Sequence, residues 1–115
     1  MDTDLTKDAE YLLCSLYKTY MDKRKSGEAK YDAKFMGSSE LIHKTLMSEW
    51  KYEDVDETCR ELTRAEYVEC LFADDVAQEV VLTDKAIVYM ENRFINGLTD
   101  VLEYMAKIKA AIPFL

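Results

Sequence analysis

Apolar side chains recur at steps of three and four residues over most of the chain, a spacing that predicts amphipathic helices. The first such segment is residues 6–25, and further helices are expected at about 38–47, at 51–65 and from Thr83 onward. Ser38 and Thr83 stand where helix N-caps are expected, because a side-chain hydroxyl oxygen accepts a hydrogen bond from a free amide of the first turn. The pattern therefore predicts a mainly α chain.

Two short runs break this helical pattern. Residues 68–72 and 79–82 are rich in apolar and β-branched side chains, and a five-residue linker, 73–77, separates them. Such runs around a short polar linker are typical of a β-hairpin. Residues 34–36 are expected to add a short first strand to it. The expected order is thus helix, turn, helix, hairpin and a further helix.

Several residues carry a resemblance to a known family. Val55, Leu62 and the pair 67–68 follow the helix-to-wing pattern of winged helix-turn-helix regulators such as the bacterial MarR and PadR groups, and residues 82–86, Leu-Thr-Asp-Lys-Ala, are similar to the run by which the wing exits. The resemblance implies a winged-helix core over residues 6–94 and a DNA-binding regulator of transcription. One position departs from the family: Glu66 stands where such proteins often place glycine, so the turn must form without a residue that adopts positive φ easily.

The resemblance also implies which side chains would meet DNA. The helix at 51–65 would be the recognition helix, lying in the major groove, and the basic end of the first helix would meet phosphates. The candidate DNA-binding residues are Lys44, Lys51, Arg60, Arg64, Lys23, Arg24 and Lys25. Helical spacing offers another interpretation of the two arginines, in which Arg60 pairs with Asp56 or Glu57, and Arg64 with Glu61.

Charge argues for a second class of function. The formal net charge is −8, and residues 53–84 contain eleven acidic side chains against Arg60 and Arg64. Binding to DNA draws its strength from cations that displace counterions, whereas this segment presents carboxylates. The alternative is therefore a protein-interaction module, or a DNA mimic, that uses its acidic helix face to engage a basic protein.

From Thr83 the chain is expected to be helical almost to its end, with Asn96–Gly97 as the one interruption. The closing segment, 95–112, predicts a long helix with an apolar stripe. The stripe alternates steps of four and three residues, as in a coiled-coil seam. Its members are Phe94, Leu98, Val101, Met105, Ile108 and Ile112. Because the winged-helix core is expected to close by Phe94, we expect this helix to form the interface of a homodimer; the other interpretation is that it packs on its own domain.

The sequence contains no recognisable catalytic set, and no enzyme activity, cofactor or metal site is expected. His43 is the single histidine, and Cys14, Cys59 and Cys70 lack the close spacing of zinc ligands. The acidic start lacks the apolar core of a signal peptide, and no run is long enough to span a membrane. We therefore expect one cytoplasmic domain, residues 1–115, that has no membrane contact.

Overall fold

The computed structural model describes residues 5–112; residues 1–4, at the acidic start, and 113–115 lie outside the described part. Within it the chain is mostly helical and carries a small antiparallel sheet. The elements are α1 (Lys7–Lys25), α2 (Lys30–Ala33), β1 (Phe35–Gly37), α3 (Ser39–Thr45), α4 (Tyr52–Arg64), β2 (Val68–Ala73), β3 (Val76–Leu82), α5 (Asp84–Arg93) and α6 (Leu98–Lys109). The expected helices and hairpin are therefore present, and Ser38 and Thr83 are N-caps whose hydroxyls accept from the amides of Leu41 and Ala86.

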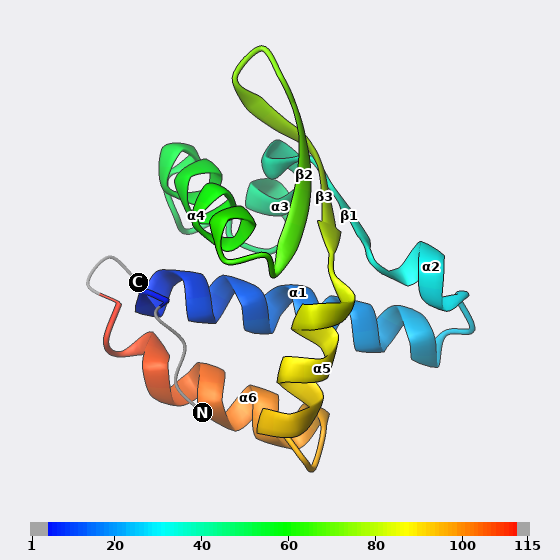
Figure 1. Ribbon diagram of the computed structural model, residues 1–115. Helices are drawn as coiled ribbons and strands as arrows, with labels where there is room; N and C mark the ends of the chain where they lie inside the picture. Colours follow the sequence, from blue (N-terminus) through cyan, green and yellow to red (C-terminus); the bar gives the residue numbers. More distant parts are fainter. Residues whose placement is uncertain (1–4, 113–115) are drawn as a thin grey trace.

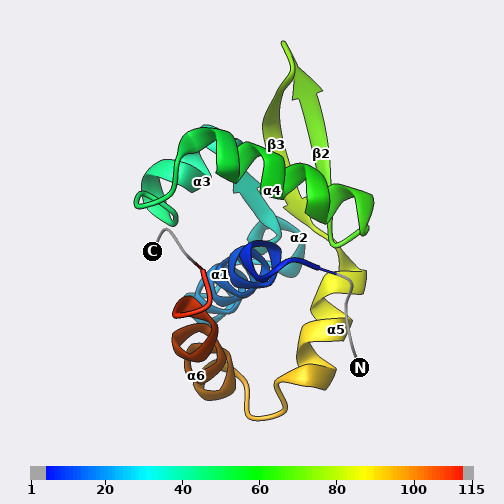
Figure 2. The ribbon, with the colours of Figure 1, turned by 90° about the vertical axis from the view of Figure 1, so that its left-hand side faces the viewer.

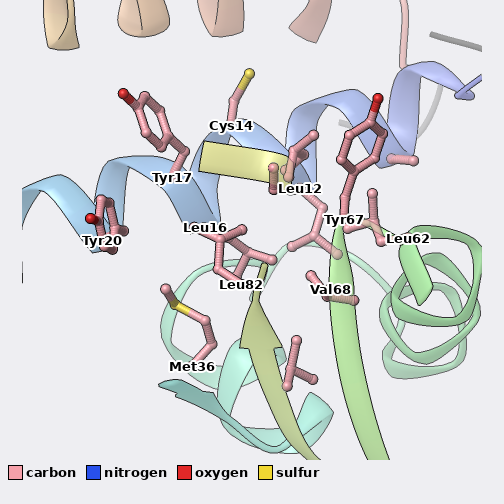
Figure 3. Packing of buried hydrophobic residues seen from close by; sticks show 14 of the residues in the cluster. Leu12, Cys14, Leu16, Tyr17, Tyr20, Met36, Leu62, Tyr67, Val68 and Leu82 are labelled. Atoms are coloured by element: carbon pink, nitrogen blue, oxygen red, sulfur yellow. The ribbon is translucent and has the colours of Figure 1, made fainter. Parts of the chain in front are cut away.

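Helix α1 runs through the centre of the molecule. The α3–α4 pair and the sheet cover one side of it, and α5 and α6 cover the other (Figures 1 and 2). All six residues from 12 to 17 are buried, which a helix packed on one side only would not allow. Figure 3 shows Leu12 and Leu16 of α1 close to Val68 and Leu82, which belong to the hairpin strands.

The sheet has the order β1-β3-β2, with both pairs antiparallel. The expected short first strand is thus present, although it begins at Phe35. The predicted linker length of five residues was wrong. Strand β2 continues to Ala73 and β3 begins at Val76, so that Asp74 and Asp75 alone form the turn. Both have positive φ, 53° and 62°, as a type I′ hairpin turn requires, although neither is the glycine or asparagine that usually supplies it.

The C-terminal segment differs most from expectation. The expected interruption at Asn96–Gly97 is present: α5 ends at Arg93, and the chain turns through Gly97 at φ 70°. Helix α6 is shorter than the expected helix over 95–112, since it ends at Lys109, and it runs back along α1 (Figure 1). Val101, Ile108 and Ile112 are at most 5 % exposed within the single chain. The core therefore extends well beyond Phe94, which is itself buried.

The apolar stripe of α6 is covered by its own chain. Four of the six expected interface residues are buried against the core, whereas Leu98 and Met105 are half-buried. The assumption that a second subunit must cover the stripe was wrong, because α3, α4 and the sheet occupy only one side of α1 and leave its other side for α6. The hydroxyl of Tyr104 adds a hydrogen bond to Glu10 of α1.

A glycine at position 66 is expected to stabilise the chain. Glu66 follows α4 with φ 67°, and the amides of Glu66 and Tyr67 donate to the carbonyls of Thr63 and Leu62, the two bonds of a Schellman cap. Because a side chain costs free energy at positive φ, Glu66→Gly should raise the unfolding free energy by about 0.5–1 kcal/mol in urea titrations. Glu69→Gly, in extended β2, should lower it; loss of stability in both variants would contradict this account.

Candidate binding surface of α4 and the hairpin

Helix α4 faces outward beside the hairpin. Val55, Cys59 and Leu62 are fully buried, as their spacing predicted, so the opposite face of the helix is turned to solvent. The hairpin of β2 and β3 projects past this helix (Figure 1). We call the outer side of α4 together with the hairpin, residues 51–82, the α4–hairpin surface.

Arg60 joins α4 to the hairpin rather than facing solvent freely. Its Nε donates to Asp56 Oδ2 at 2.9 Å, one of its terminal nitrogens donates to the backbone oxygen of Asp75, and its guanidinium lies 4.7 Å from the ring centre of Phe72. The hydrogen bond that Arg60 donates to Asp56 raises the pKa of Arg60 above its ordinary value. The pair predicted from helical spacing is thus confirmed, and Arg60 holds the tip of the hairpin against α4.

Asp56 extends this link to α3. Its Oδ1 accepts from the hydroxyl of Ser39 at 3.1 Å and from the amide of Ala77 at 3.4 Å, and the Ser39 hydroxyl lies 3.0 Å from that of Tyr52. Ser39 is fully buried. This network fixes α3, α4 and β3 relative to one another. No sequence pattern indicated this role for Ser39, because its neighbour Ser38 already supplies a complete helix-cap signal.

The predicted ion pair of Arg64 with Glu61 was wrong. Arg64 lies 3.5 Å from Glu57, not beside Glu61, and both side chains of this pair are 65 % or more exposed. Such an exposed pair contributes little to stability. Glu61 instead accepts from both the amide and the hydroxyl of Thr6, each at 2.8 Å, and so ties α4 to the start of α1.

The candidate DNA-binding residues are not brought to one surface. Lys44 and Lys51 are exposed near the start of α4, whereas Lys23, Arg24 and Lys25 lie at the far end of α1, beside α2 (Figure 1). Two of the latter are also engaged there: Lys23 donates to the backbone oxygen of Phe35 at 2.6 Å, and Arg24 to that of Glu28 at 3.0 Å. The basic end of α1 therefore does not extend the α4–hairpin surface.

The α4–hairpin surface is acidic. Residues 51–82 contain ten carboxylates against three basic side chains, and the hairpin itself, 66–82, contains no lysine or arginine. The exposed carboxylates are those of Glu53, Glu57, Glu66, Glu69, Asp74 and Asp75. The pKa of Asp8, in α1, is raised first by its burial and then by the negative charges of Asp54 and Glu61 in α4.

Exposed apolar side chains lie within this acidic surface. Leu71 is 68 % exposed and Phe72, under the guanidinium of Arg60, is 39 % exposed. Carboxylates around exposed apolar side chains offer two kinds of contact to a partner, charge pairing and burial of apolar area.

Other kinds of site are not found in the described chain. Between residues 5 and 112, no three histidine, cysteine or acidic side chains are grouped so as to hold a metal ion. Over the same residues, every helix is too short or too polar to cross a bilayer. Comparison with known proteins finds no family model, no curated protein and no solved structure that matches this chain.

Proposed function

We propose that this chain is a winged-helix protein whose α4–hairpin surface binds a lysine- or arginine-rich segment of another protein. The order of α3, α4, β2 and β3, with β1 beside β3, supports the winged-helix part. One observation carries the functional part: both arginines of α4 are paired with carboxylates of the same helix, and the surface around them keeps a large excess of negative charge.

The charge distribution disfavours a polyanion at this surface. To contact phosphates, Arg60 would have to give up Asp56 and the Asp75 carbonyl, and the exposed carboxylates would then face the phosphates without compensation. A cationic peptide meets the opposite situation, because the field of the surface attracts it and speeds its association. Leu71 and Phe72 supply apolar area that such a peptide would cover.

The order of elements supports a second candidate, a DNA-binding transcription regulator that acts as a homodimer. In winged helix-turn-helix proteins the helix in the place of α4 enters the major groove. Lys44 and Lys51 are exposed near the start of this helix, where they could meet phosphates. Since α1 covers most of the α6 stripe, a homodimer would join through apolar side chains that remain exposed, such as Ile95 and Leu102, at 82 % and 44 %.

Reversing the charge of the outer face of α4 should abolish binding of a basic peptide. We expect the double substitution Glu53→Lys with Glu57→Lys to weaken the binding of a lysine-rich peptide at low salt by more than about tenfold, because two attractive charges become repulsive. Titration with a fluorescently labelled peptide measures the affinity. Added salt should weaken the wild-type complex as well.

A matched variant separates this surface from net charge alone. Glu91→Lys with Glu103→Lys makes the same change of charge at exposed positions of α5 and α6, and should retain most of the affinity. Equal losses in the two variants would contradict the proposal. If a random-sequence DNA duplex binds at low salt instead, and Arg60→Ala with Arg64→Ala weakens it, the regulator is the correct function.

A further inference from the structure

Strand β2 has a free edge. In the order β1-β3-β2, β3 is paired on both sides, whereas β2 has a neighbour on one side only. The amide of Thr83 donates to the carbonyl of Tyr67 at 3.1 Å, so these two residues form a hydrogen-bonded pair. Along an antiparallel ladder, hydrogen-bonded pairs alternate with pairs that exchange no hydrogen bond. The backbone of Glu69 is therefore again bonded to β3, whereas the amides and carbonyls of Val68 and Cys70 point away from β3.

These outward groups have no partner among residues 5–112. Beyond the ladder to β3, no backbone hydrogen bond in residues 5–112 uses the amides or carbonyls of Val68 and Cys70. A row of free amide and carbonyl groups is a template on which another extended chain can pair. Natural edges are commonly blocked by lysine, proline or a covering loop, and β2 contains neither lysine nor proline.

A groove of about 580 Å³ follows this edge. Thr63 of α4 and Glu66, in the turn after α4, form one wall, and β2 forms the other through Val68, Glu69 and Cys70. Lys85 is the one basic side chain that lines it, and its Nζ already donates to the carbonyl of Ala65 at 3.0 Å. Glu66 and Glu69 are exposed, so the groove presents hydrogen-bonding groups beside negative charge.

We propose that the basic partner segment binds here as an added strand, paired to the backbone of Val68 and Cys70. This inference rests on the proposed function and specifies its geometry. The segment is extended, carries lysine or arginine beside Glu66 and Glu69, and places an apolar side chain beside Leu71, which shares the outer face of β2 with Glu69. A second copy of this chain fits less well, because its own β2 would bring Glu69 into a groove that is already acidic.

Two peptides of identical side chains test the pairing. The first is an extended lysine- and valine-containing peptide, and the second is the same peptide N-methylated at alternate backbone amides, which keeps its charge but removes the donors of a strand. We expect the second peptide to bind at least about tenfold more weakly. In hydrogen exchange followed by NMR, only the first should slow exchange at the Val68 and Cys70 amides. Equal binding without such slowing would overturn the added strand and leave the proposed function intact; failure of both peptides to bind would overturn both.

A variant of the protein gives a second test. Cys70→Pro removes an outward amide without removing a donor to β3, and an edge strand tolerates proline at such a position. Cys70→Ala keeps the amide and is the matched control. We expect the proline variant to bind the first peptide at least about tenfold more weakly than the alanine variant, provided that both show the same circular dichroism spectrum. Equal affinities in two folded variants would overturn the pairing, and the two peptides decide the question if the proline variant does not fold.

Discussion

Replacement of Val101 by aspartate is expected to destabilise this chain strongly. Val101 is fully buried where α6 lies on α1, and its neighbours in the core are apolar. A carboxylate placed there would lose its hydration without gaining a partner, at a cost of several kcal/mol. We therefore expect Val101→Asp to lower the unfolding free energy by at least about 4 kcal/mol. That is a large part of the total, since domains of this size are stable by only about 5–15 kcal/mol. Urea unfolding followed by circular dichroism measures the loss.

The adjacent residue provides the control. Leu102 is 44 % exposed on the same helix, and Leu102→Asp should change the unfolding free energy by less than about 0.5 kcal/mol. Sedimentation of both variants then distinguishes packing within one chain from a seam between two. A folded Val101→Asp monomer, formed from a wild-type dimer, would show that α6 covers a second subunit instead of its own α1.

Most elements of this fold, though not the short helix α2, were predictable because they depend on local signals. The burial of Val55, Cys59 and Leu62 follows from their helical spacing, and Ser38 caps α3 through atoms only a few residues away. The position of α6 was not predictable in this way. An apolar stripe shows that a helix must be covered, but it does not show whether the cover is the far side of α1 or a second subunit.

The same distinction holds for the binding surface. The pair of Arg60 with Asp56 lies within one helix and follows from a spacing of four residues. The bonds from Ser39 to Asp56 and from Thr6 to Glu61 join residues 17 and 55 positions apart, and no local pattern encodes them. Ser39 and Thr6 hold the carboxylates of Asp56 and Glu61 in place. The sequence therefore showed that this surface is acidic, but it did not show how the carboxylates are arranged.

Alkaline pH should destabilise the chain strongly between about pH 9 and 12. Burial raises the pKa of the Cys14 and Cys59 thiols from 9.0 to about 12, and it raises the pKa of Tyr104, which is hydrogen-bonded to Glu10, from 10.0 to about 12. All three groups stay protonated in the folded chain at a pH where the unfolded chain has lost these protons. The stability they provide is therefore complete below pH 9 and is lost as the pH approaches 12.

The two thiols dominate this expected loss. At 1.36 kcal/mol for each pKa unit, a difference of about three units corresponds to about 4 kcal/mol for each thiol, a large part of the stability of a small domain.

Cys14→Ala with Cys59→Ala should lower the unfolding free energy at neutral pH, because two buried sulfur atoms are lost, but should also make its decline above about pH 9 much shallower. Urea titrations at several pH values measure both slopes. The relevant quantity is the difference between these slopes, since lysine and tyrosine deprotonation changes the wild type and the variant alike. Parallel curves for the two proteins would mean that water reaches Cys14 and Cys59 in the folded chain, so that the core around α1 is less closely packed than their burial implies.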